Sequence, residues 1–261
     1  MKQKKQSSLE LKAWLIILAV ALLLTGIGLL LLLLSGSGSF SDFFADLAEI
    51  NIWLLVGIIV VMAGGIVLLV KTADRQSSSK WSINELVVAA LCIALSFVLS
   101  YIKVYELPNG GSITPASMLP IFLFAYIYGP VKGLLVSFAF SLLQMTQGLY
   151  VVHWAQFLLD YVFAFTVLGV AGFFRKSFIS GIVAGGLLRF LCAFLSGAIF
   201  FAEYAPEGQG AILYSLLYNA SYMLPEILIC IGIALLPGMR RTLESLKARE
   251  LAKKQTPAPQ A

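Results

Sequence analysis

Charged residues are scarce in this chain. They make up 12% of its 261 residues, while 60% are hydrophobic and the mean hydropathy is +0.93. An average soluble domain is about 25% charged. So little charge cannot cover a water-facing surface of this size, which excludes a soluble globular enzyme, a disordered protein and a nucleic-acid binder. The composition instead indicates an integral membrane protein. We therefore attribute the formal net charge of +5 to an excess of lysine and arginine in its cytoplasmic loops.

Residues that carry chemistry are also few. His153 is the single histidine, which excludes a histidine-rich metal site. The three cysteines lie inside apolar runs, with neither metal-ligand spacing nor the pattern of a disulfide framework. The chain has no Walker A loop and so cannot hydrolyse ATP by itself, and it has neither H-E-x-x-H nor G-x-S-x-G. We expect no enzyme, no metal and no cofactor bound by this chain.

What the sequence does contain is a series of apolar runs long enough to span a bilayer. A span needs about 20 apolar residues. Two nearly pure apolar runs come first, at 13–34 and 52–70, followed by a polar linker at 71–80. Six mixed runs with glycine, serine, proline and a few ionisable residues follow, at 83–102, 116–128, 133–147, 155–174, 180–201 and 211–236.

These runs predict an all-α integral membrane protein with eight spans in three parts. Residues 1–75 form a two-helix transmembrane hairpin and linker, residues 76–241 a six-helix bundle, and residues 242–261 a basic, frayed tail. With the N-terminus inside, the outer loops hold Lys103 as their only basic residue and most of the loop carboxylates. The positive-inside rule therefore predicts that both termini are cytoplasmic.

Three ionisable residues fall inside the later spans: Asp160, Arg189 and Glu226. A charge within the membrane is costly and must find a partner inside the bundle. One interpretation is a structural ion pair between Asp160 and Arg189. However, His153, Gln156 and Asp160 are spaced to share one helical face, which is polar within an apolar segment and should point inward. This pattern favours a ligand-binding role for Asp160, whereas His153 is more simply an interfacial residue.

Aromatic residues cluster towards the outer end of the last spans. Tyr214, Tyr218 and Asn219 follow one another at near-helical spacing. Aromatic faces beside a carboxylate suit a flat cation. The alternative is a belt of aromatic residues at the membrane surface. That alternative accounts for Phe200 and Tyr204, but not for an asparagine within a span.

Residues 81–241 resemble the thiamine-specific substrate-binding (S) component of energy-coupling factor (ECF) transporters, the ThiT family. The resemblance rests on LPNGGSITPASMLPI (107–121), YGPVKGLLVS (128–137), YVVHWAQFLLDYVFAFTVLGVAG (150–172), RFLCAFLSGAIFFAEYAPEG (189–208) and YSLLYNASYMLPE (214–226). It implies a six-helix S-component bundle in the bacterial cell membrane that binds thiamine near its outer face. It also implies docking on a transmembrane coupling protein with two ATPase subunits, which use the ATP.

The resemblance also implies roles for particular residues. Positions where the family binds thiamine are occupied here by Tyr150, Asp160, Tyr161, Tyr214 and Asn219. Aromatic residues that line the family's pocket correspond to Phe140 and Phe201, and the alanine surface that docks on the coupling protein corresponds to Ala90 and Ala94. The N-terminal hairpin lies outside the resemblance.

Two positions depart from the family. Asp160 stands where glutamate is usual, and Ala193 stands where a histidine is common. These departures leave open a shifted preference towards another heteroaromatic vitamin or precursor. A further alternative is a membrane scaffold whose pocket has decayed, although buried polar residues such as Asp160 and Asn219 argue against decay.

Overall fold

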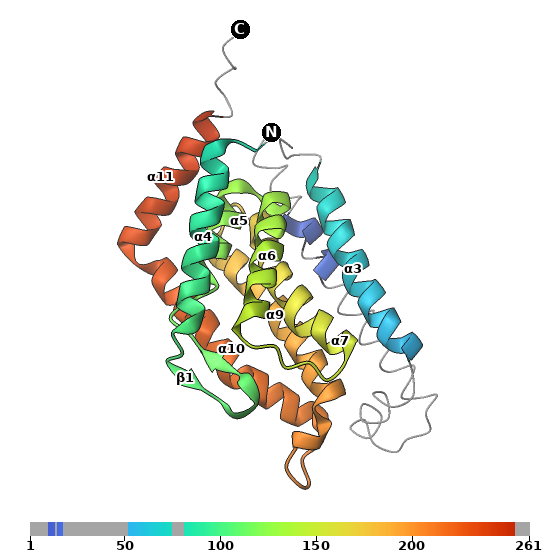
Figure 1. Cartoon of the computed structure of the whole chain (residues 1–261). Coiled ribbons are helices and arrows are strands. Elements are labelled where there is room, and N and C mark those ends of the chain that lie inside the picture. Colours follow the sequence, from blue (N-terminus) through green and yellow to red (C-terminus); the bar gives the residue numbers. More distant parts are fainter. Residues whose placement is uncertain (1–9, 14, 18–51, 75–80, 254–261) are drawn as a thin grey trace.

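The computed structural model describes residues 10–13, 15–17, 52–74 and 81–253, which are mainly helical (Figure 1). The long helices are α3 (Ile52–Asp74), α4 (Ile83–Tyr101), α5 (Leu119–Tyr128), α6 (Pro130–Gln144), α9 (Phe178–Phe200), α10 (Ala211–Leu235) and α11 (Pro237–Lys253). Between α6 and α9 the chain forms a single helical rod from four short pieces: α7 (Trp154–Phe157), the π-helix η3 (Leu158–Phe163), α8 (Ala164–Thr166) and the 3₁₀ helix η4 (Val167–Phe173).

The remaining elements lie in the loops at one end of the bundle. A small antiparallel hairpin follows α4 and pairs β1 (Tyr105–Glu106) with β2 (Ser112–Ile113) around the 3₁₀ turn η1 (Pro108–Gly110). The 3₁₀ turns η2 (Met145–Gln147) and η5 (Ala202–Tyr204) follow α6 and α9. The sequence did not predict the hairpin, because two-residue strands leave no alternation of apolar and polar residues.

The apolar runs predicted from residue 83 onwards match helices of the structure within a few residues. Among the described residues, four helices are long and apolar enough to cross a membrane: Ile83–Tyr101, Trp154–Phe173, Phe178–Phe200 and Ala211–Leu235. Two shorter apolar helices lie at Val56–Leu68 and Leu119–Tyr128. The described residues therefore form a mainly helical fold with several helices that are able to span a membrane. Most of the first predicted span, 13–34, lies outside the described residues.

Glycines allow the helical rod to pack closely against α6. A Cβ atom at Gly169 would lie 2.4 Å from the backbone nitrogen of Leu134, and one at Gly172 would lie 2.5 Å from the backbone of Gly129 and Pro130. No larger residue fits at either position without moving the backbone. This contact fixes the rod, and with it η3, against the centre of the bundle.

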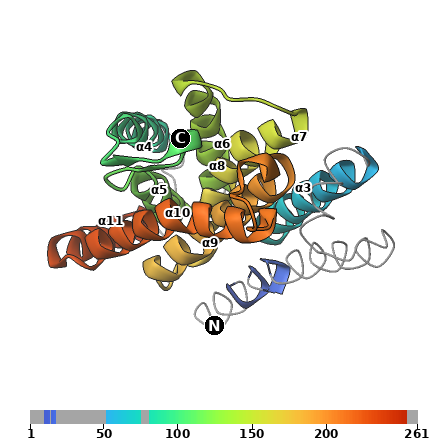
Figure 2. The same cartoon turned by 90° about the horizontal axis from the view of Figure 1, so that it is seen from below.

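Helices α3 and α4 lie on opposite sides of the bundle (Figures 1 and 2). Helix α3 packs against α6, α7 and η3, and its Ile58 and Met62 are buried in one apolar cluster with Leu134, Ala155 and Leu159. Helix α3 therefore packs directly on the bundle that follows it in the sequence. Helix α4, by contrast, exposes most of its apolar side chains along an outer face.

The tail predicted to fray from residue 242 instead continues the helix α11 to Lys253, so that prediction was wrong for residues 242–253. Leu243 is buried against the bundle. Lys247 Nζ lies 2.9 Å from the hydroxyl of Tyr126 and 4.5 Å from the centre of its ring, and it also donates to the carbonyl of Arg175. These contacts hold a highly charged helix against α5.

Candidate functional site

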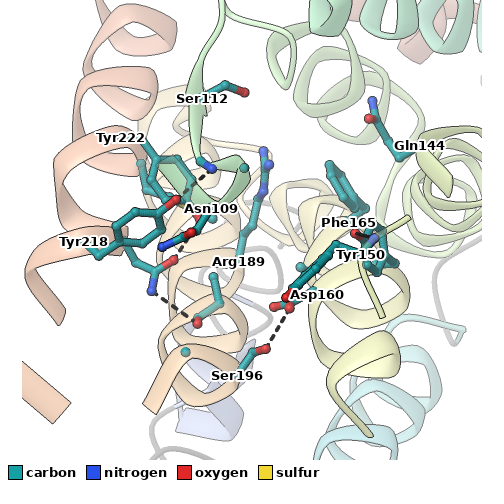
Figure 3. Close-up of a pocket in the computed structure, with 18 of the residues that line it drawn as sticks. Asn109, Ser112, Gln144, Tyr150, Asp160, Phe165, Arg189, Ser196, Tyr218 and Tyr222 are labelled. Carbon is teal, nitrogen blue, oxygen red and sulfur yellow. Dashed lines mark hydrogen bonds between the residues drawn. The ribbon is translucent and has the colours of Figure 1, made fainter. Parts of the chain in front are cut away.

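A cavity of about 330 Å³ opens between η3, α9, α10 and the outer hairpin (Figure 3). Pockets for small molecules run from about 300 to 1,000 Å³, so this volume suits a compact molecule of one or two rings. Its wall combines aromatic rings with polar side chains from segments far apart in the sequence. Among the residues that line it are Asn109, Gln144, Tyr150, Asp160, Phe165, Arg189, Ser196, Tyr218, Tyr222 and Glu226.

Asp160 reaches the cavity from the π-helix η3. Its Oδ2 atom accepts hydrogen bonds from Gln156 Nε2 and Ser196 Oγ, both at 2.7 Å. The predicted pairing of Gln156 with Asp160 on one helical face is thus confirmed. Both donors are neutral, so the carboxylate is hydrogen-bonded without a counter-charge from either. π-helical turns occur frequently at functional sites, where the extra residue changes the direction of a side chain.

The alternative interpretation, an ion pair between Asp160 and Arg189, is not seen among the described residues. Arg189 Nη1 instead lies 3.9 Å from Glu226 Oε2 on α10, and its guanidinium lies 4.5 Å from the ring centre of Phe165. Glu226 Oε1 accepts hydrogen bonds from the hydroxyls of Thr114 at 2.5 Å and Ser117 at 2.8 Å. The three charged residues therefore form two separate polar groups in one cavity.

Tyrosines connect the loops around the cavity. The backbone N–H of Tyr150 donates to the hydroxyl of Tyr161 at 2.9 Å, and the hydroxyls of Tyr150 and Tyr204 lie 3.0 Å apart. This hydrogen bond raises the pKa of Tyr204 above its ordinary value. Phe201 stacks on the ring of Tyr150 with ring centres 6.1 Å apart.

The outer hairpin is fastened to α10. The backbone N–H of Gly111 donates to the hydroxyl of Tyr218 at 2.8 Å, and that hydroxyl donates to the carbonyl of Pro108 at 2.5 Å. Asn109 Nδ2 donates to the hydroxyl of Tyr214 at 3.3 Å. A Cβ atom at Gly111 would lie 2.8 Å from both Tyr218 and Tyr222, so only glycine allows the hairpin to come this close.

Asn219 lies one step deeper along α10. Its Oδ1 accepts a hydrogen bond from the hydroxyl of Tyr222 at 2.7 Å, and its Nδ2 donates to the carbonyl of Ser215 at 2.9 Å. The asparagine thereby orients the Tyr222 ring at the cavity wall.

Most residues singled out in the sequence do meet at this cavity. Those that line it are Tyr150, Asp160, Tyr161, Phe201, Tyr214 and Asn219, together with Ala193. Phe140 does not line it: its ring is fully buried and meets Phe165 edge-on, with ring centres 5.6 Å apart. It therefore supports the wall from behind. His153 caps the start of α7 through Nδ1 and stacks on Phe200, outside the lining.

Other lining residues escaped sequence reasoning. Glu226 was recognised as an ionisable residue in a span but not as part of a site. The hydroxyls of Thr114, Ser117 and Ser196 gave no signal, because serine and threonine are common in membrane helices and loops. The described residues contain no group of three or more histidine, cysteine, aspartate or glutamate side chains that could hold a metal ion.

Comparisons with known proteins agree with the resemblance noted in the sequence. Residues 86–244 match the family described as thiamine transporter protein (Thia_YuaJ). The thiamine transporter ThiT of Bacillus subtilis is 34% identical over 185 residues, which cover 63% of this chain and 96% of that protein. ThiT of Lacticaseibacillus paracasei is 25% identical over 169 residues, covering 56% and 81%.

The fold is also that of a solved relative. The structure of ThiT from Listeria monocytogenes aligns with a TM-score of 0.55 at 24% identity, and the alignment covers 62% of this chain and 97% of that one. The family match covers more than half of the chain, and the bundle with its cavity lies within the matched region. The chain therefore belongs to the thiamine transporter (Thia_YuaJ) family.

Proposed function

We propose that this chain binds thiamine in the cavity and serves as the substrate-binding component of an ECF-type importer. The observation that carries the proposal is the charge of the cavity wall. Inside the bundle the wall holds two carboxylates, Asp160 and Glu226, and one guanidinium, Arg189, which leaves one negative charge. Lys103 also lines the cavity, but its ammonium is half-exposed and is neutralised by Glu106 at 2.5 Å. Thiamine carries one positive charge on its thiazolium ring, so its binding would neutralise the cavity.

Asp160 is the residue best suited to face the thiazolium. Neutral donors hold its carboxylate in place, since its hydrogen-bond partners among the described residues are Gln156 and Ser196. A buried carboxylate gains most from a cationic ligand when no protein cation already neutralises it. The rings of Tyr150 and Phe201 line the same cavity and can cover the face of the cation.

A titration of the purified full-length chain with thiamine tests the proposal. Asp160→Asn keeps the shape of the side chain and removes its charge, so we expect affinity to fall at least about tenfold, or 1.4 kcal/mol. The matched control is Glu244→Gln on α11, where the carboxylate is 71% exposed and pairs with Arg240 across one helical turn. Unchanged affinity in Asp160→Asn, or no thiamine binding by the unaltered chain, would overturn the proposal.

Uptake would require partner subunits. The sequence has no Walker A loop, and in the importer proposed here the energy comes from two ATPases that act through a transmembrane coupling protein. The surface proposed for docking is the outer face of α4, where Ala90 and Ala94 are exposed one turn apart. Small residues at this spacing let a partner helix approach closely. Cells that cannot synthesise thiamine should accumulate it only when chain and coupling module are expressed together.

The proposed orientation places both termini in the cytoplasm of a bacterial cell, with eight spans in its cell membrane. The charge pattern supports this orientation, since the basic α11 and the Arg175–Lys176 turn lie together, while β1 and its Glu106 lie at the opposite end of the bundle (Figure 1). The cavity would then open to the outside. A membrane-impermeant label should modify a cysteine introduced in the hairpin of intact cells, but not one introduced in α11.

A further inference from the structure

Binding a thiazolium at Asp160 leaves a second set of polar atoms in the cavity unused. Arg189 Nε and Nη1 are buried and make no hydrogen bond with any described residue. Glu226 Oε2 likewise accepts none from the described residues, although Oε1 accepts two. The two free edges face one another, with Nη1 and Oε2 3.9 Å apart.

A separation of 3.9 Å does not fit a stabilising ion pair. Charge-assisted hydrogen bonds between nitrogen and oxygen are about 2.7–2.9 Å long. A buried ion pair is favourable only when its geometry is good and its remaining donors are satisfied, and neither condition holds here. The pair Glu85–Lys132 in the same chain shows the contrast, since its nitrogen and oxygen are 2.6 Å apart.

The two side chains are nevertheless held firmly. Glu226 is fixed through Oε1 by the hydroxyls of Thr114 and Ser117, and Ser117 N–H also donates to Thr114 Oγ1. The guanidinium of Arg189 lies over the ring of Phe165. A donor edge and an acceptor edge are thus fixed side by side before any ligand arrives, which lowers the cost of ordering them on binding.

We infer that Arg189 and Glu226 recognise the neutral ring of the ligand, as a donor–acceptor edge for an aminopyrimidine. The ring nitrogen next to the amino group would accept from Arg189, and the exocyclic amino group would donate to Glu226 Oε2. This inference rests on the proposed function and deepens it: Asp160 selects the charge of the ligand, while Arg189 and Glu226 select its hydrogen-bonding pattern. Such a ring would satisfy the buried polar atoms that the chain leaves unpaired.

Oxythiamine tests the inference, because it replaces the amino group by a carbonyl and places a proton on the adjacent ring nitrogen. Both positions of the edge are then mismatched, while charge, size and thiazolium ring are unchanged. The unaltered full-length chain should bind thiamine at least about tenfold more tightly than oxythiamine. Equal affinities in that chain would overturn the inference without requiring any variant to fold.

Glu226→Gln gives the sharper readout. Its carbonyl can keep the hydrogen bonds from Thr114 and Ser117, which places an N–H₂ donor where Oε2 stood. The variant loses a negative charge and so loses affinity for both thiamine and oxythiamine. Because both ligands carry the same positive charge, this loss cancels in the ratio of their affinities. We expect the preference for thiamine to disappear or reverse, and Arg189→Met to reduce it as well.

The matched control is Ser196→Ala, which touches Asp160 and not Glu226. This variant should bind both thiamine and oxythiamine more weakly and leave the ratio of the two affinities unchanged. A ratio that stays constant in Glu226→Gln and Arg189→Met would overturn the inference while thiamine binding itself stands. Failure of the unaltered chain to bind thiamine would instead refute the proposed function.

Discussion

The buried charges of this chain are stabilised in three different ways. Glu85 and Lys132 form a direct pair at 2.6 Å, with Trp81 beside the ammonium at 5.3 Å from its ring centre. Asp160 relies on neutral donors, and Glu226 relies on two hydroxyls and a distant guanidinium. The first arrangement is complete within the protein, whereas the other two leave charge or polar atoms open to a ligand. This difference separates structural from binding residues.

The pair Glu85–Lys132 should contribute to stability and not to binding. Neither residue lines the cavity, and their side chains are only 8% and 4% exposed. Lys132→Met leaves a buried carboxylate without a cation, which should destabilise the fold by about 3–5 kcal/mol. The double variant Glu85→Gln with Lys132→Met removes both charges and should regain most of the loss. Thermal unfolding in detergent measures both, and equal unfolding temperatures for the single and double variants would contradict the expectation.

Sequence reasoning succeeded for residues whose partners are close in the chain. Gln156 and Asp160 are one helical turn apart, so their contact follows from spacing. It failed for Arg189, whose partner Glu226 lies 37 positions away on another helix, because no local pattern reports which faces of two helices meet. Phe140 was wrongly predicted to line the pocket for a related reason. The sequence does not show whether an aromatic ring lies at the pocket surface or behind another ring.

At the scale of elements, the outer hairpin closes the side of the cavity against α10. Tyr218 supplies both a donor and an acceptor to it, at Pro108 and Gly111. We expect this connection to slow the opening of the hairpin. The sequence could not predict it, since β1 and β2 have two residues each and the contact joins positions 107 or more apart.

Tyr218→Phe should therefore speed the release of thiamine. The variant keeps the ring and loses two hydrogen bonds of roughly 0.5–1.5 kcal/mol each, so the dissociation rate should rise at least about fivefold. Stopped-flow fluorescence with a competing ligand measures this rate. The control is Tyr105→Phe in the same hairpin, whose hydroxyl makes no hydrogen bond with the described residues. Equal rates in the two variants would show that the hairpin does not limit release.

Helix α4 presents a second element with a separable role. Its outer face exposes Ala90 and Ala94 among large apolar side chains, and neither alanine lines the cavity. Replacing both with tryptophan should abolish uptake by preventing the close approach of a partner helix, and should leave thiamine affinity unchanged. Uptake in cells with the coupling module and titration of the purified variant give the two readouts. A parallel fall in both would show that this face packs within the protein.

At the scale of the whole molecule, composition and charge predicted the class of fold, but not how its parts pack. The apolar runs indicated the helices because lipid requires long stretches without charge. The same composition concealed the position of α3, since a helix that is apolar all round gives no sign of which face meets the bundle. Helix α3 buries Ile58 and Met62 in the same apolar cluster as Leu159, which directly precedes Asp160 in the sequence.

Removal of the N-terminal hairpin tests whether this packing matters for the site. No described residue of α3 lines the cavity, and its contacts with Leu134, Ala155 and Leu159 are apolar. Lipid tails are as apolar as these side chains, so they can cover the surface that α3 leaves. A chain that begins at Ser77 should therefore bind thiamine within about threefold of the full chain in a titration. A larger loss of affinity would show that α3 supports the π-helix that carries Asp160. Loss of uptake alone would assign the hairpin to contact with the coupling protein.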